Sequence, residues 1–153
     1  MIDIITMPKI KCATVEHIGD FSLIGEAFDK MKKLGDKAKL LNMNCKIFGF
    51  YTSRPCDMPV SQLRSMAGFS IEENVSLEGS DLEPYVFEGG KYATVLHKGP
   101  YDTLRKTYEK LFGELLPASK LKLTSKHSFE EYLNNPHVTE PSQLLTKIGI
   151  SVE

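Results

Sequence analysis

The chain has 153 residues, of which 19 are basic and 20 acidic, so its formal net charge is -1. This length is enough to bury roughly two thirds of the unfolded surface without a disulfide or a metal ion. A charge so near zero provides no field that attracts nucleic acid, and no apolar run approaches the roughly 20 residues that cross a bilayer. We therefore expect a single cytoplasmic domain over residues 1–153 that binds neither nucleic acid directly nor membrane.

The three cysteines, Cys12, Cys45 and Cys56, are odd in number and widely spaced. This pattern fits neither a disulfide framework nor a zinc site, so we expect reduced thiols, no metal and no cofactor. No phosphate-binding loop, GxSxG elbow or HExxH motif is present. The sequence therefore assigns no catalytic residue.

The first half of the chain predicts a strand, a helix and a strand pair. β-branched residues are frequent in residues 2–17, which indicates an extended lead-in and then a strand, and apolar residues recur at helical spacing in residues 21–39. Residues 46–51 and 64–75 read as strands joined by a turn at residues 52–59.

The second half predicts the same order of elements. Residues 77–90 are acidic and contain Pro84, so we expect a connector there. A strand over residues 91–97 precedes a helix over residues 102–115, which Pro117 is expected to end. Strands over residues 128–133 and 144–152 complete this half. The helix is expected to face inward with Leu104, Tyr108, Leu111, Phe112 and Leu115.

The text of residues 11–31 recurs at residues 91–111, with an offset of 80 positions. Ala13, Thr14, Val15, His17, Gly19 and Lys30 recur as Ala93, Thr94, Val95, His97, Gly99 and Lys110, while Phe21, Phe28 and Asp29 recur as Tyr101, Tyr108 and Glu109. At an offset of 81, Phe48, Tyr51, Pro55, Ser61, Gln62, Leu63, Gly68 and Ser70 recur as Phe129, Tyr132, Pro136, Ser142, Gln143, Leu144, Gly149 and Ser151. The chain is therefore an internal duplication.

The duplication predicts an α+β fold of two βαββ repeats, about residues 10–75 and 90–153. A sheet with one helix leaves a face to bury, so we expect the antiparallel sheets to pair about a pseudo-twofold axis and form a central groove. Grooves of this kind are natural ligand sites. Its expected aromatic walls are Tyr51, Tyr92, Tyr101 and Tyr132.

Ser128 to Glu131 also match a helix capping box, but strand is favoured because the repeat partner at residues 48–51 has strand composition. With period two, Glu130 shares a strand face with Tyr132 while Glu131 faces the other way. Glu130 replaces Gly49 of the first repeat, so the fold does not demand it. Such an acid suits a cation or a hydrogen-bonding ligand, or is simply a solvated carboxylate.

His17 and His97 precede the turn glycines Gly19 and Gly99 at the same repeat position. They are candidate general bases, but a duplicated structural role, such as bonding the turn backbone, is the favoured interpretation.

The sequence resembles the GyrI-like small-molecule-binding domains, the family of the bacterial gyrase inhibitory protein and of AraC-type effector domains. The matching text is His97 to Tyr101, Ser128 to Pro136 and Pro141 to Leu144. The resemblance implies paired βαββ units that bind amphipathic, often cationic, molecules between aromatic walls and a carboxylate. A helix-turn-helix region is not expected, so the domain is interpreted as stand-alone.

Two positions depart from the family pattern. Lys147 stands where members commonly carry an acid, and Met66 stands at the matching position of the first half, where an aspartate is common. If Ile148 and Ile150 fill the core, Lys147 faces the groove opposite Glu130 and weakens cation binding; the alternative is that Lys147 lies on an exposed edge and has no effect. Met66 and Lys147 therefore join the candidate ligand-binding residues.

Three functions remain open from the sequence. The first is binding of an apolar or amphipathic organic molecule, for sequestration or sensing. The second is hydrolysis of electrophilic compounds by Glu130 with Tyr132 or Tyr101. The third is a protein-interaction module that acts on a regulator or on gyrase through its surface.

Overall fold

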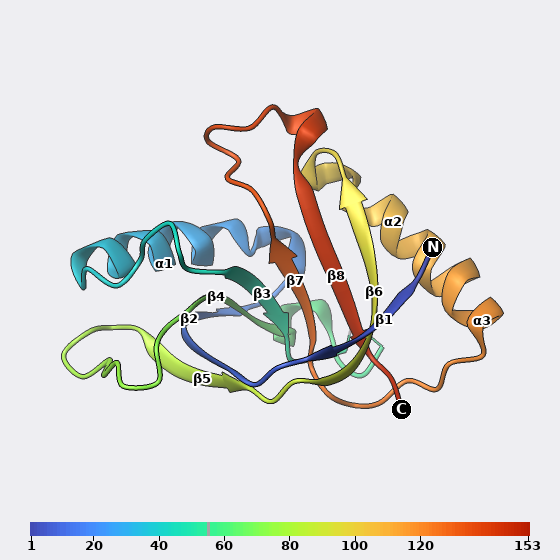
Figure 1. Ribbon diagram of the computed structural model, residues 1–153, viewed down its shortest axis with the longest axis horizontal. Helices are drawn as coiled ribbons and strands as arrows, with labels where there is room; N and C mark the ends of the chain where they lie inside the picture. The colour runs from blue at the N-terminus through green and yellow to red at the C-terminus, as the bar shows by residue number, and fades with distance from the viewer. Residues whose placement is uncertain (55) are drawn as a thin grey trace. The chain divides into compact units, whose positions relative to one another are not determined.

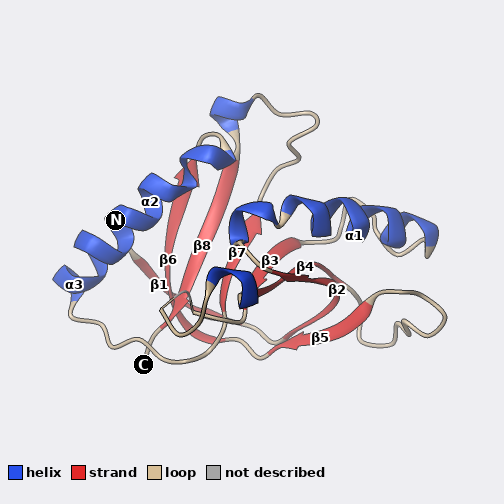
Figure 2. Cartoon of the chain, turned by 180° about the vertical axis from the view of Figure 1, so that it is seen from behind, coloured by secondary structure: helices blue, strands red, loops and turns tan. Residues whose placement is uncertain are grey.

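The computed structural model describes residues 1–54 and 56–153, which form two compact units. One unit is Pro8–Gly89, and the other combines Met1–Met7 with Gly90–Glu153. In the described residues, each unit has a four-stranded antiparallel sheet with a helix packed on one face (Figures 1 and 2). The predicted α+β class is therefore confirmed.

The unit Pro8–Gly89 has the strand order β5-β2-β4-β3. Its elements are β2 (Ile10–Ile18), α1 (Gly25–Lys37), β3 (Ile47–Tyr51), β4 (Arg64–Ser70) and β5 (Glu83–Phe87). Alternate residues of β2 and β4, such as Val15 and Phe69, pack against Ala27 and Met31 of α1. The predicted strand over residues 64–75 ends at Ser70, and Pro55 of the predicted turn lies outside the described residues.

The other unit has the strand order β1-β6-β8-β7. Its elements are β1 (Asp3–Met7), β6 (Gly90–Lys98), α2 (Leu104–Lys110), a π-helical turn (Leu111–Leu115), α3 (Leu116–Ser119), β7 (Ser128–Tyr132) and β8 (Leu145–Ser151). Val95 and Ile148 pack against Leu111 and Leu116 of the helical segment. The strand assignment of residues 128–133, preferred over a helix, is confirmed.

Each sheet takes its first strand from the other sequence repeat. β1 pairs with β6 and β5 pairs with β2, although β1 precedes β2 and β5 precedes β6 in the chain. Thr94 Oγ1 donates to the carbonyl of Asp3, and Thr14 Oγ1 donates to the carbonyl of Glu83. Asp3 and Glu83 are 80 positions apart, which is the offset of the repeats. The connector predicted for residues 77–90 is therefore wrong, because it contains a strand that corresponds to β1. Pro84 is tolerated there because β5 is the terminal strand of its sheet.

The helical segment of the second repeat also differs from the prediction. Pro117 does not end it, since this residue lies in the first turn of α3, where a missing N–H is tolerated, and the helix ends at Ser119. Phe112, predicted to face inward, is 47% exposed, while Leu116 is buried. A π-helical turn holds one residue more than an α-turn. This extra residue changes which side chains face the sheet and explains why the repeat offset grows from 80 to 81.

The two histidines have the duplicated structural role that the sequence favours. His17 Nε2 lies 2.8 Å from the carbonyl oxygen of Asp20, and His97 Nε2 lies 3.2 Å from that of Pro100. The turn glycines that follow have positive φ, 121° at Gly19 and 135° at Gly99. The prediction of backbone-bonding histidines is confirmed.

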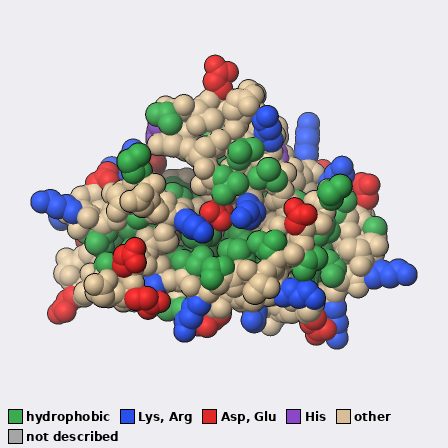
Figure 3. All heavy atoms as spheres, in the orientation of Figure 1, with side chains coloured by type: hydrophobic (Ala, Val, Ile, Leu, Met, Phe, Trp, Pro, Cys, Tyr) green, Lys and Arg blue, Asp and Glu red, His purple; other side chains and the backbone are tan. Residues whose placement is uncertain are grey.

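The molecular surface carries charges of both signs. Lys and Arg side chains are interspersed with Asp and Glu over the face shown in Figure 3. Among the described residues, no helix combines the length and the apolar character needed to cross a membrane.

Candidate functional site

Glu130 is a buried carboxylate that faces helix α2. The residue is 5% exposed and lies opposite Ile148 in the β7–β8 register, so it shares the helix-covered face of its sheet. Tyr108 of α2 donates to its Oε2 at 2.5 Å, and Tyr132 of β7 donates to its Oε1 at 2.6 Å. Two phenol hydroxyls therefore hold the carboxylate in place.

A third tyrosine completes this group. The ring of Tyr101 meets that of Tyr132 edge to face, with centroids 5.5 Å apart, and Tyr101 is 36% exposed. Burial, and then the negative charge of Glu130, raise the pKa of Tyr101 above its ordinary value. We call Tyr101, Tyr108, Glu130 and Tyr132 the tyrosine–carboxylate cluster. It runs from a buried acid to a partly exposed aromatic ring.

The first repeat keeps the aromatic frame of this cluster and the hydroxyl of Tyr51, which corresponds to Tyr132, but it lacks the acid and the other two hydroxyls. Phe21 and Tyr51 form the same edge-to-face pair, with centroids 4.9 Å apart. At the positions of Tyr108 and Glu130 the first repeat has Phe28 and Gly49. The buried acid is therefore present in the second repeat alone, and the fold does not require it.

Each unit buries one hydroxyl without a partner among the described residues, Thr146 Oγ1 and Ser65 Oγ. Thr146 lies between His97 and Tyr132 in register, and Ser65 lies between His17 and Tyr51. A buried hydroxyl that lacks a partner costs about 1–3 kcal/mol. In both repeats the residue that carries this hydroxyl lies opposite the tyrosine of the aromatic pair.

Lys147 does not face Glu130. It lies opposite Glu131 in register, and its Nζ is 3.7 Å from Glu131 Oε1. Because neighbouring residues of a strand point to opposite faces, Lys147 and Glu130 lie on different faces of the sheet. The predicted Lys147–Glu130 contact is therefore wrong, and Lys147 instead pairs with a second, largely buried acid.

Tyr92 also lies apart from the cluster. It is 1% exposed, donates to the carbonyl of His127 at 2.7 Å and packs edge to face on Phe129. Burial raises its pKa to about 12. Phe129 in turn covers Gly149, where a Cβ would come within 2.1 Å of the ring. These contacts make Tyr92 a packing residue of the sheet face opposite the helix.

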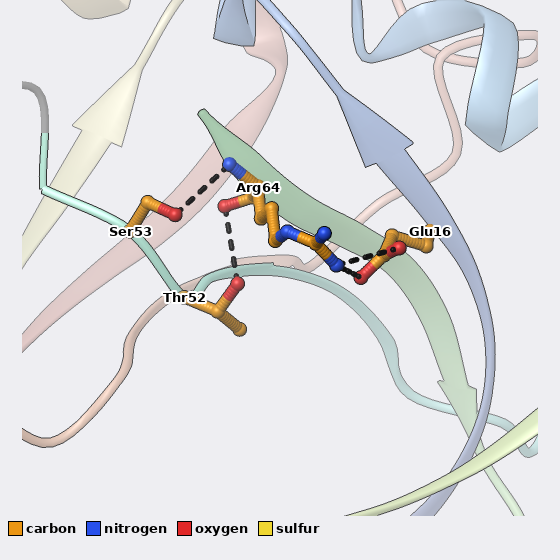
Figure 4. A network of polar contacts seen from close by, with 4 residues as sticks. All are labelled: Glu16, Thr52, Ser53 and Arg64. Atoms are coloured by element: carbon orange, nitrogen blue, oxygen red, sulfur yellow. Dashed lines mark hydrogen bonds and ion pairs between the residues drawn. The ribbon is translucent and has the colours of Figure 1, made fainter. Parts of the chain in front are cut away.

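Tyr51 and Met66 belong to the unit Pro8–Gly89. Tyr51 lies on the helix-covered face with Ser65, whereas Met66 lies on the other face between Glu16 and Phe50. Beside it, the guanidinium of Arg64 contacts both carboxylate oxygens of Glu16 at 3.3 Å, as Figure 4 shows. Within this unit, Tyr51 and Met66 therefore do not share a site.

Sequence reasoning missed the role of Tyr108, which it assigned only to the inner face of the helix. A signal was present in the comparison of the repeats. Tyr108 is more polar than its equivalent Phe28, and Glu130 is more polar than its equivalent Gly49. Paired gains of this kind indicate contact in space. Within residues 1–54 and 56–153, no three His, Cys, Asp or Glu side chains group as a metal ion requires.

The fold and this cluster define a duplicated α+β domain with an aromatic, acidic cluster in its second repeat. Residues 1–153 match the GyrI-like small molecule binding domain, and the chain belongs to that family. The resemblance predicted from the sequence is thus confirmed.

The chain is similar to several proteins over part or all of its length. It is 32% identical over 87 residues to the DNA gyrase inhibitor of Salmonella arizonae (strain ATCC BAA-731 / CDC346-86 / RSK2980), an alignment that spans 56% of each chain. The C-terminal domain of EcmrR superposes with a TM-score of 0.82 at 22% identity, covering 100% of this chain and 97% of that one. SAV2435 bound to tetraphenylphosphonium has a TM-score of 0.73 at 13% identity, with 100% and 94% covered. At these identities the two structures show a shared fold.

Proposed function

We propose that the chain binds a small amphipathic organic cation at the tyrosine–carboxylate cluster. The observation that carries this proposal is Glu130, a 5% exposed carboxylate held by two tyrosine hydroxyls beside a third tyrosine. A cation near such a group gains Coulomb attraction that water screens weakly, and aromatic faces add cation–π attraction.

Two further features support a cationic ligand. Lys147, which would repel a cation beside Glu130, contacts Glu131 on the other sheet face. The partly exposed ring of Tyr101 offers an apolar surface to the body of the ligand. SAV2435, which shares the fold, is described as bound to tetraphenylphosphonium, a cation of this class.

Titration calorimetry with tetraphenylphosphonium tests the proposal. Glu130→Gln keeps the shape of the side chain and removes its charge, so we expect the dissociation constant to rise tenfold or more. Triphenylphosphine oxide, an uncharged compound with similar rings, should bind the wild type more weakly than the cation.

Glu114→Gln is the matched control, because Glu114 is an exposed acid on the same helical segment. It should leave the affinity unchanged within about twofold. Thermal unfolding of each variant shows whether it is folded. Equal affinities of a folded Glu130→Gln variant and the wild type would refute the proposal.

A second candidate is hydrolysis of an electrophilic small molecule. The 2.5 Å contact of Tyr108 with Glu130 favours it, since a tyrosine and a carboxylate side by side can orient a water molecule. Mass spectrometry of an electrophile panel after incubation with wild type and Glu130→Gln separates the two candidates. Turnover lost in the variant supports hydrolysis. Binding without turnover supports a ligand-binding domain, and the absence of both supports a protein-interaction module.

A further inference from the structure

A concave surface lies between strand β6 and helix α2. It is a cavity of about 330 Å³, within the range of small-molecule sites. Val95, Leu96 and Leu115 contribute apolar surface to it, and Lys106, Thr107 and Lys110 contribute polar groups. α2 lies alongside β6 in both ribbon views (Figures 1 and 2).

The charge of this cavity is opposite to that of the tyrosine–carboxylate cluster. Lys106 and Lys110 are one helical turn apart, and neither makes an ion pair with any residue that the structure describes. The acid nearest to them in sequence, Glu109, is 3.1 Å from Arg105. Two ammonium groups therefore flank an apolar surface without an acidic partner.

The first repeat shows that the fold does not require this arrangement. At an offset of 80, Leu96 corresponds to Glu16 and Lys106 to Glu26, while Lys110 corresponds to Lys30. The equivalent positions of the first repeat thus hold two acids and one lysine, and one of these acids, Glu16, is paired with Arg64.

The helix that forms one wall is irregular at this position. The π-helical turn Leu111–Leu115 begins directly after Lys110 and ends on Leu115, which lines the cavity. Turns of this kind hold an extra residue at a cost in backbone hydrogen bonding and are frequent at functional sites. The first repeat has a regular helix, α1, without such a turn.

We propose that the cavity between β6 and α2 binds a small organic anion, a molecule with an apolar body and one carboxylate or sulfonate group. Lys106 and Lys110 bind the acid group, and Val95, Leu96 and Leu115 contact the body. The chain then has two sites of opposite charge preference, one for cations at Glu130 and one for anions at Lys106 and Lys110.

Fluorescence titration with anilinonaphthalene sulfonate, beside its uncharged relative N-phenylnaphthylamine, tests this proposal. We expect Lys106→Glu/Lys110→Glu to raise the dissociation constant of the sulfonate tenfold or more, since two attractive charges become repulsive. The affinity for the uncharged probe should change less than twofold.

Lys32→Glu/Lys33→Glu is the matched control, because it makes the same change of net charge at exposed positions of α1. It should leave sulfonate binding within about twofold of the wild type, as should Glu130→Gln, which separates this site from the tyrosine–carboxylate cluster. The proposal is overturned by any of three results. The first is that the wild type shows no saturable binding of the sulfonate. The second is that the two lysine double variants lose sulfonate affinity equally. The third is that Lys106→Glu/Lys110→Glu weakens binding of the uncharged probe as much as binding of the sulfonate.

Discussion

Tyr108 of α2 donates a 2.5 Å hydrogen bond to Oε2 of Glu130 on β7 and so joins the helix to the sheet through a buried acid. In the first repeat the corresponding residues are Phe28 and Gly49, which cannot form this bond. Only the second repeat therefore has both the donor and the acceptor. Their coupling can be measured directly.

Tyr108→Phe should lower the free energy of unfolding by about 1.5–3 kcal/mol, because it removes a hydrogen bond to a charged group. Tyr101→Phe is the control, since the structure gives the Tyr101 hydroxyl no hydrogen bond among the described residues, and should cost less. Urea denaturation measures both. In the Glu130→Gln background, Tyr108→Phe should cost less than in the wild type; strictly additive costs would mean that the two residues are not coupled.

Lys147→Glu should destabilise the fold without changing cation binding. It places a second carboxylate next to Glu131, whose side chain is 10% exposed, so we expect a cost of about 1–2 kcal/mol in urea denaturation. Affinity for tetraphenylphosphonium should stay within twofold, because Lys147 lies on the other sheet face from Glu130. A tenfold gain in affinity would restore the sequence-based expectation that Lys147 opposes Glu130.

Thr146→Val should stabilise the protein by about 1 kcal/mol, because valine has the same shape and leaves no buried hydroxyl without a partner. Thr124→Val is the opposite case, because Thr124 Oγ1 lies 2.5 Å from Ser151 Oγ and the variant removes this hydrogen bond. It should therefore destabilise the protein. Thermal unfolding compares the two variants. Destabilisation by Thr146→Val would show that its hydroxyl is satisfied in solution.

The free energy of unfolding should fall in alkali because Tyr92 is buried. Burial raises its pKa in the folded protein to about 12, above its ordinary value, so the folded state favours the protonated phenol. The stabilisation is complete below pH 10 and is lost as the pH rises through 12. Urea denaturation across this range should show a steeper decline for wild type than for Tyr92→Phe. Parallel curves for the two proteins would contradict the prediction.

Removal of residues 1–7 should loosen the sheet of the second repeat, because β1 pairs with Gly90–Thr94 of β6. Hydrogen exchange of the Lys91 to Thr94 amides should quicken tenfold or more. The amides of β4 serve as the internal reference, because the sheet neighbours of β4 are β3 and β2 and not β1. Unchanged exchange in β6 would mean that β1 contributes little to the sheet.

Local features of this chain could be predicted from its sequence. The helix over residues 21–39 depends on periodicity within one segment. The duplication, and through it the strand over residues 128–133, follows from comparing two segments of the sequence. The roles of His17 and His97 were equally predictable, because each bonds a carbonyl only three residues further on. The placement of Glu130 and Tyr132 on one strand face follows from the period of two.

Only the tertiary structure decided which strands pair and which side chains meet. The exchange of β1 and β5 between repeats leaves no local signal, since pairing partners lie 69 to 91 residues apart. Lys147 meets Glu131 because strand register, and not strand period, sets the residue opposite it. The π-helical turn moves Phe112 outward and Leu116 inward by a single extra residue, a shift that helical periodicity cannot reveal.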